Sequence, residues 1–188
     1  KILVLGFSVT AEKSGFVEQA RSRFKEDNAL EIVKTGMGGM QPYHGRYLFP
    51  SIIHRHAPDA IVLDIATPAF RNFSVSQEPY KNTLISVLRL CHERGIRLAL
   101  LDLPRTDVDY SDDWVTLYNA RICADLGLPY WAVPLTEGLL RDEVHPTPEG
   151  QAIYADALIE LTGMVAPVPA LPDVLTEGLP YFDAIAVN

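Results

Sequence analysis

Five short apolar runs alternate with five stretches of helical character along most of this chain, and that alternation limits the folds open to it. The apolar runs cover residues 1–6, 31–35, 59–66, 97–104 and 129–134, and the helical stretches cover residues 10–25, 45–56, 78–94, 111–126 and 147–161. The third and fourth runs are almost continuously apolar, which is typical of strands buried on both faces of a parallel sheet. Parallel strands joined by helices require right-handed crossovers. The sequence therefore predicts an α/β fold, a three-layer α/β/α sandwich with a five-stranded parallel sheet.

The chain is long enough for one sizeable core, since it has 188 residues of which 48% are hydrophobic. We expect residues 1–162 to form one domain of flavodoxin-like type. Residues 163–188 are rich in proline and show no amphipathic period, yet they carry too many apolar side chains for a freely solvated linker. We therefore expect them to form a tail that packs on the domain.

Charge and cysteine content disfavour several classes of partner. The net charge is −8 and no cluster of Lys or Arg is present, so nucleic acid and acidic lipid surfaces, which would repel the chain, are disfavoured as partners. Cys91 and Cys123 both fall in helical stretches, which predicts buried thiols rather than a disulfide or a zinc site. No apolar run approaches the roughly 20 residues of a membrane span. No signal peptide is visible, so a cytoplasmic location is slightly favoured; the oligomeric state is left open.

The loops that follow the strands hold the residues with chemical potential. In open α/β sheets, ligands bind beyond the carboxyl ends of the strands, so these loops are expected to meet. Ser8 follows the first strand, and Asp142 and His145 follow the last in the spacing D-x-x-H. That spacing lets a carboxylate hold one ring nitrogen of an imidazole while the other nitrogen takes a proton from a hydroxyl. The order predicts a nucleophile, a base and an orienting carboxylate.

A glycine-rich loop, "TGMGGMQP", follows the second strand and holds Gly36, Gly38 and Gly39. Glycine lets a backbone N–H approach a reacting oxygen closely, as an oxyanion hole requires. The loop lacks the phosphate-loop pattern, so phosphate binding is disfavoured. Taken alone, Ser8 would be interpreted as a helix cap; its combination with the glycine loop and D-x-x-H favours a catalytic site.

These motifs resemble the SGNH/GDSL-type hydrolases. "VLGFSVT" is similar to that family's first block with Ser8 as nucleophile, "VKTGMGGMQPYHG" to its second block with Gly39 as the glycine, and "DEVHPTPEGQAIYADAL" to its last block with Asp142 and His145. The resemblance spans about residues 1–161. It implies the flavodoxin-like SGNH-hydrolase topology, a catalytic domain over residues 1–162, and a reaction that needs no metal and no organic cofactor.

Two departures from the family pattern bear on activity. Phe7 stands where the first block usually has an acid. The third block usually reads Gly-x-Asn-Asp, but Pro68 and Ala69 occupy the places of Asn and Asp. The missing side-chain donor to the oxyanion could be Asn72 or Thr67, or the hole could rest on the backbone N–H groups of Ser8 and Gly39 alone.

The function expected from this resemblance is ester hydrolysis through an acyl-enzyme. Ser8, His145 and Asp142 form the triad, and Ser8, Gly39 and Asn72 are the candidate oxyanion donors. The substrate expected is a small-molecule or carbohydrate ester with a short acyl group, an O-acetyl group first. Two alternatives remain open: an O-acetyltransferase that acts in polysaccharide modification, and a catalytically degenerate binding domain.

Overall fold

The structure, a computed structural model, describes residues 1–24, 30–68, 77–109 and 111–177. Its sheet has five parallel strands in the order β2-β1-β3-β4-β5. The strands are β1 (Ile2–Phe7), β2 (Ile32–Met37), β3 (Ala60–Leu63), β4 (Arg97–Asp102) and β5 (Tyr130–Ala132). This order is the flavodoxin-like one, so the predicted sheet and topology are confirmed.

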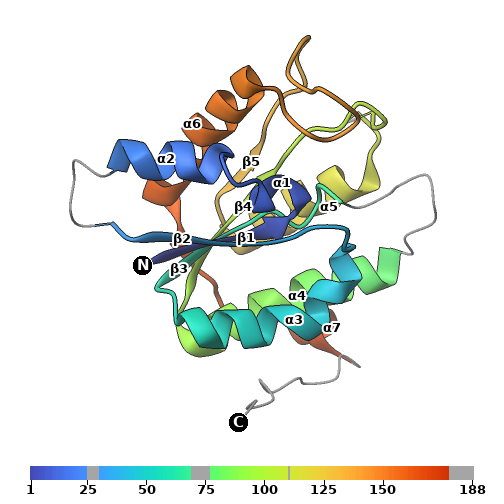
Figure 1. The fold of residues 1–188 in the computed structure, drawn as a ribbon. Helices are drawn as coiled ribbons and strands as arrows, with labels where there is room; N and C mark the ends of the chain where they lie inside the picture. The colour runs from blue at the N-terminus through green and yellow to red at the C-terminus, as the bar shows by residue number, and fades with distance from the viewer. Residues whose placement is uncertain (25–29, 69–76, 110, 178–188) are drawn as a thin grey trace.

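Helices cover both faces of the sheet and complete the three predicted layers (Figure 1). One face carries α1 (Ser8–Ala11), α2 (Phe16–Phe24) and α6 (Pro148–Met164), and the other carries α3 (Pro42–His56), α4 (Gln77–Arg94) and α5 (Trp114–Leu126). Successive side chains of a strand point to opposite faces. In β1, Leu3 and Leu5 therefore join the core on the α3 side, and Ile2 and Val4 join the core on the α2 side.

The first helical stretch differs from its prediction. The pattern over residues 10–25 indicates one helix, but the chain forms α1, then a turn, then α2. Glu12 ends α1 in an extended conformation, and the N–H of Gly15 donates to the Glu12 carbonyl across the turn. Long-range contacts of Glu12 hold this turn, and side-chain periodicity does not register such contacts.

The segment after α6 adds a short strand that the sequence did not predict. β6 (Ala166–Pro167) pairs antiparallel with the start of β4, while β5 pairs with the end of β4. Val168 is buried in the core of the α3 face, and its carbonyl contacts Nδ1 of His92 at 2.9 Å. α7 (Asp173–Thr176) follows. Residues 166–168 therefore lie against the sheet and its core. Residues 178–188 lie outside the described residues, so the packing of the whole tail stays a prediction.

Candidate active site

Ser8 lies at the junction of β1 and α1, on the carboxyl edge of the sheet. It is the first residue of α1, and Phe7 occupies the N-cap position without a side-chain capping bond. A capping hydroxyl would bind an N–H two or three residues on, as the first interpretation of Ser8 required. Ser8 makes no such bond and remains partly exposed, so its side chain has no structural role as a cap.

The residues beside Ser8 show why this turn has its sequence. A Cβ atom at Gly6 would lie 2.3 Å from Oγ1 of Thr10 and 3.1 Å from Oδ2 of Asp64, so only glycine lets α1 and the β3 loop approach this closely. Phe7 stands at the position where the resemblance to the first block implied an acid. Its ring is buried against that of Phe49 in α3, with centroids 6.0 Å apart. The departure from the family pattern therefore serves the core.

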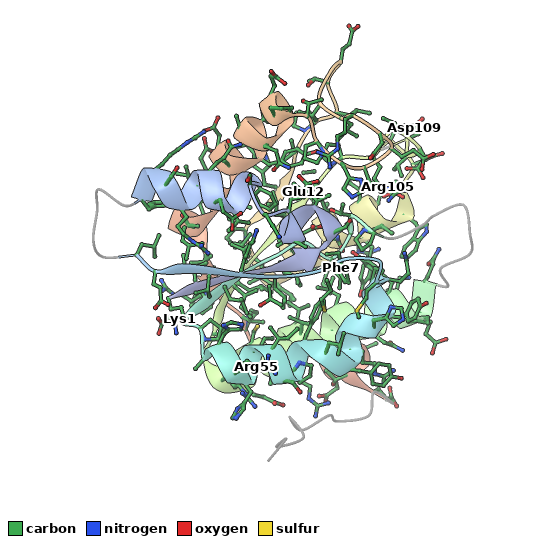
Figure 2. The ribbon with its side chains drawn as sticks, in the orientation of Figure 1. Lys1, Phe7, Glu12, Arg55, Arg105 and Asp109 are labelled. Atoms are coloured by element: carbon green, nitrogen blue, oxygen red, sulfur yellow. The ribbon has the colours of Figure 1, made fainter. Side chains whose placement is uncertain are left out.

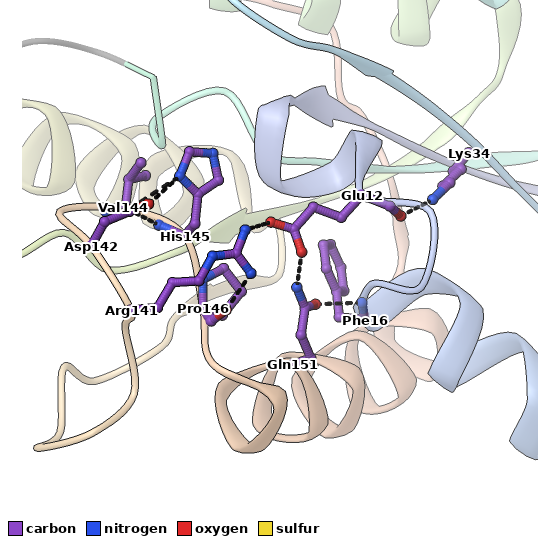
Figure 3. Close-up of polar contacts among 9 residues, drawn as sticks. All are labelled: Glu12, Phe16, Lys34, Arg141, Asp142, Val144, His145, Pro146 and Gln151. Carbon is purple, nitrogen blue, oxygen red and sulfur yellow. Dashed lines mark hydrogen bonds and ion pairs between the residues drawn. The ribbon is translucent and has the colours of Figure 1, made fainter.

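Asp142 and His145 are in contact, as their spacing predicts. Nδ1 of His145 lies 2.9 Å from Oδ2 and 3.1 Å from Oδ1 of Asp142. The backbone N–H groups of Val144 and His145 also donate to Oδ1 of Asp142, at 2.9 and 2.7 Å. Figure 3 shows the His145 ring held against this carboxylate. The arrangement fixes the ring orientation and leaves Nε2 as the nitrogen able to take a proton.

Hydrogen bonds set the protonation of the Asp142 carboxyl. Desolvation by itself raises the pKa of Asp142, but the N–H groups of His145 and Val144 and the His145 ring stabilise the charged form. The second effect is larger and lowers the pKa of Asp142 to about 2. Asp142 is therefore an anion at neutral pH, which is the form that stabilises a protonated imidazole.

Contacts between loops bring the D-x-x-H turn next to the Ser8 turn. Nη2 of Arg141 donates to Oε1 of Glu12 at 2.7 Å, which joins the turn to the end of α1 (Figure 3). On its other side, the N–H of Thr106 in the β4 loop donates to the Glu143 carbonyl at 3.0 Å. Three loops of the carboxyl edge therefore meet around residues 141–146.

The glycine loop begins level with Ser8. Phe7 is paired with Met37 in the parallel register of β1 and β2, so Gly38 follows β2 at the height where Ser8 follows β1. Gly39 has a φ of +71°, a conformation that favours glycine. Gly36 has a different role from the donor role that its place in the loop indicates. A Cβ atom there would lie 2.3 Å from the backbone nitrogen of Ala11, so Gly36 makes room for α1.

The loop after β3 holds a buried carboxylate. Asp64 accepts hydrogen bonds from the hydroxyl and N–H of Thr67 and from the Thr10 hydroxyl. Both donors of Thr67 are thus used internally, which disfavours Thr67 as an oxyanion donor. Pro68 has no N–H to offer. Asn72, the side-chain donor that the sequence suggests, lies outside the described residues, as does Ala69.

Sequence reasoning missed the residues that hold these loops together. Arg105 is 1% exposed, and its guanidinium binds the Thr67 carbonyl at 2.8 Å and both oxygens of Asp107. It thereby connects the β3 and β4 loops, and Figure 2 shows Arg105 on the same side of the sheet as Glu12. A buried arginine among polar loop residues, such as Arg105, leaves no periodic signal in the sequence. Arg141 is the other residue that holds these loops, and its position directly before D-x-x-H is the one sequence signal that points to that role.

Three further observations concern contacts and groups that the described residues lack. Within the part of the chain that the structure describes, no hydrogen bond joins the Ser8 hydroxyl to the His145 ring; such bonds are often long before substrate binds and tighten afterwards. Among the same residues, no three His, Cys, Asp or Glu side chains gather closely enough to hold a metal ion. A separate search of the described helices finds none that is both long and apolar enough to cross a membrane.

Several solved structures share this arrangement of strands and helices. No protein-family model and no curated protein matches the sequence. The acetyl xylan esterase AlAXEase is 15% identical with a TM-score of 0.72, and the match covers 85% of this chain and 98% of that one. A catalytic mutant of Axe2, an acetylxylan esterase from Geobacillus stearothermophilus, is 17% identical with a TM-score of 0.72, and the match covers 86% of this chain and 93% of that one. A GDSL-like lipase from Bacteroides thetaiotaomicron is 20% identical with a TM-score of 0.65, and the match covers 86% of this chain and 88% of that one.

These similarities identify the fold. The matches cover 88–98% of each solved chain, so the shared fold is that of nearly the whole chain and not of a fragment. The chain has the fold of the SGNH/GDSL-type hydrolases, as its motifs predict.

Proposed function

We propose that this protein is a serine ester hydrolase with Ser8 as nucleophile, His145 as general base and Asp142 as the orienting carboxylate. The observation that carries the proposal is the contact of 2.9 Å between Nδ1 of His145 and Oδ2 of Asp142, in a turn joined to the end of the Ser8 helix. An imidazole that is oriented by a carboxylate and lies near a serine hydroxyl with no capping role is the arrangement that activates such a hydroxyl.

The reaction proceeds in two balanced steps. Oγ of Ser8 attacks the ester carbonyl carbon while Nε2 of His145 takes the hydroxyl proton; the same nitrogen then gives that proton to the alcohol oxygen as the C–O bond breaks. In the second step, water attacks the acyl-serine, His145 takes a proton from the water and returns it to Oγ of Ser8, and the acid leaves. The N–H groups of Ser8 and Gly39, with Asn72 as the proposed side-chain donor, stabilise the oxyanion in both steps.

The proposed substrate is a short-acyl ester, with an O-acetyl group on a carbohydrate as first choice. Two of the similar structures bear the names of acetylxylan esterases, which supports a sugar acetate. A hollow of about 380 Å³ lies beside the D-x-x-H turn, where Thr106 contacts the Glu143 carbonyl. Thr106, Thr136 and Glu137 line it together with Leu135 and Leu140, which offers polar groups for sugar hydroxyls beside the turn that carries the base.

The loop after β3 favours one alternative function. Pro68 takes the place of the family's asparagine, and both donors of Thr67 bind Asp64. If residues 69–76 supply no donor, the oxyanion hole loses one of its usual hydrogen bonds, which costs about 10²–10³ in kcat in a serine hydrolase. A binding domain with the same shape and no turnover is the function that such a loss would favour.

Ester hydrolysis by wild type and Ser8→Ala tests the proposal. We expect wild type to hydrolyse p-nitrophenyl acetate and Ser8→Ala to lose about 10⁴-fold or more in kcat, with circular dichroism and melting temperature unchanged, because only a partly exposed hydroxyl is removed. A fluorophosphonate should label Ser8 in wild type. Equal rates for the two proteins, or labelling of another residue, would refute the assignment.

Acyl length and acceptor distinguish the finer proposals. We expect p-nitrophenyl acetate to be turned over faster than the butyrate and octanoate esters, and acetylated xylan to release acetate. Transfer of the acetyl group to added xylooligosaccharide, in place of release to water, would identify a transferase. Absence of turnover, with saturable binding of xylooligosaccharide, would identify a binding domain.

A further inference from the structure

Arg141 connects the D-x-x-H turn to the helix that begins with Ser8. Its backbone N–H donates to the His145 carbonyl at 2.9 Å, and Nη1 donates to the Pro146 carbonyl at 3.1 Å, so the residue closes the turn on both sides of the Asp142–His145 pair. Nη2 donates to Oε1 of Glu12 at 2.7 Å. One guanidinium thus holds the shape of the turn and its place against α1 (Figure 3).

Glu12 is held from behind by buried groups. Its second oxygen, Oε2, accepts a hydrogen bond from Nε2 of Gln151 at 2.5 Å, and Oε1 of Gln151 accepts from the N–H of Phe16 at 2.6 Å. Gln151 is 4% exposed and belongs to α6. Nζ of Lys34 donates to the Glu12 carbonyl. With Oε2 held by Gln151, the Glu12 carboxylate presents Oε1 to Arg141 in a fixed orientation.

We propose that Arg141 and Glu12 are positioning residues that set the separation between Ser8 and His145. Glu12 lies about one helical turn after Ser8, and His145 lies four residues after Arg141 within the closed turn. The ion pair is thus a short physical connection from the nucleophile to its base. The inference rests on the proposed function, because it assigns these two residues to the same reaction.

The solvent exposure of the Arg141–Glu12 ion pair lets its effect on kcat be distinguished from an effect on folding stability. The side chains of Arg141 and Glu12 are 53% and 20% exposed, and ion pairs at that depth contribute little to folding. A displacement of about 1 Å between catalytic groups, in contrast, can cost about 10²-fold in rate. Loss of the pair should therefore lower kcat while the protein keeps its stability. KM should change little, because neither residue is assigned to substrate binding.

The chain offers a matched control in Arg23 and Asp156. This pair also joins an arginine to a carboxylate across a long stretch of sequence, but it links α2 to α6 instead of the D-x-x-H turn to α1. Its side chains are 42% and 65% exposed. None of the contacts described for the candidate site includes either residue, so its loss reports the cost of removing such a pair without touching the turn.

The experiment compares Arg141→Met with Arg23→Met, using p-nitrophenyl acetate as substrate. We expect Arg141→Met to lower kcat 10- to 100-fold with KM within about twofold, and Arg23→Met to retain wild-type kcat. Both variants should melt within a few degrees of wild type. Arg141→Lys should fall between wild type and Arg141→Met, because an ammonium lacks the planar fork that serves Glu12 and Pro146 together.

A double-mutant cycle with Glu12→Gln tests whether the two residues act through one contact. If they do, the double variant Glu12→Gln/Arg141→Met should be no slower than the slower single variant. Hydrogen exchange gives a readout that does not depend on turnover. The amides of Val144 and His145 should exchange faster in Arg141→Met than in Arg23→Met, since the turn has lost its support.

The outcomes separate this inference from the proposed function. Wild-type kcat in Arg141→Met beside an inactive Ser8→Ala overturns the inference alone, as do strictly additive losses in the cycle or unchanged exchange of Val144 and His145. An inactive wild type, or a fully active Ser8→Ala, overturns the proposed function and with it the catalytic consequence of the ion pair.

Discussion

At the residue scale, the Asp142 carboxylate is the central acceptor of the candidate site. Its oxygens accept hydrogen bonds from the His145 ring and from two backbone N–H groups. These donors hold its pKa at about 2, below the ordinary value of 3.8. A carboxyl with a lowered pKa in the folded state stabilises that state above its unfolded pKa, and the contribution is lost as the pH falls through the folded value. The turn should therefore keep its hydrogen bonds down to about pH 3.

An NMR titration checks this pH dependence. The side-chain carboxyl ¹³C signal of Asp142 should titrate with a midpoint near 2, and the amide protons of Val144 and His145 should shift with the same midpoint, because they donate to that carboxylate. In Asp142→Asn these two amides should show no transition between pH 5 and 2. A midpoint at 3.8 or above in wild type would contradict the hydrogen-bond arrangement.

At the level of elements, the junction of β1, α1 and the β3 loop is packed with no room for a methyl group at Gly6. The Thr10 hydroxyl and the Asp64 carboxylate both lie within 3.1 Å of the position that an added Cβ would take, and both side chains are buried. Overpacking of this kind costs about 1–3 kcal/mol in a well-packed interior. It should also move α1, and with it Ser8, relative to the sheet.

Gly6→Ala should therefore lower the unfolding free energy by about 1–3 kcal/mol and lower kcat at the same time. Gly163→Ala is the matched control, since Gly163 lies in α6 and its added Cβ would meet no atom within 4 Å apart from its chain neighbours and the helix's own backbone. Alanine in a helix is favoured over glycine by about 0.5–1 kcal/mol, so the control should gain stability. Urea unfolding and p-nitrophenyl acetate assays measure both effects; a Gly6→Ala protein as stable and active as wild type would refute the close packing.

For the whole molecule, the two buried thiols report whether the domain unfolds in one cooperative step. Burial raises the pKa of Cys91 to about 12, and burial together with the Asp102 carboxylate raises the pKa of Cys123 to about 12. They lie in α4 and α5, two different helices of the same core. A thiolate is the reactive form, so reaction requires opening of the structure.

Ellman's reagent at pH 8 should therefore react with neither thiol in the native protein and with two thiols per chain in denaturant. Under mildly destabilising conditions both should react at one rate, because each is exposed only by global unfolding. Cys91→Ser and Cys123→Ser give the single-thiol rates. A faster reaction of Cys123 alone would show that α5 opens separately from the rest of the domain.

The sequence by itself determined the architecture and supplied the residues proposed for catalysis. Hydrophobic runs of strand and helix length are local signals, and the alternation of the two leaves little choice besides a parallel α/β sheet. Ser8 could be proposed because it stands directly after β1, and Asp142 and His145 because they lie in the loop between the last parallel strand, β5, and α6. Asp142 and His145 are also so close in the chain that one turn brings them together.

Only the tertiary structure decided how the loops are held. The break between α1 and α2, the pairing of β6 with β4, the buried Arg105 and the Arg141–Glu12 pair all depend on contacts between residues far apart in the chain. Glu12 and Arg141 are 129 residues apart, and neither differs in the sequence from an ordinary surface charge. Such contacts form only after the strands have paired in the order β2-β1-β3-β4-β5, which brings loops that are distant in sequence together at the carboxyl edge of the sheet. No local sequence pattern therefore encodes them.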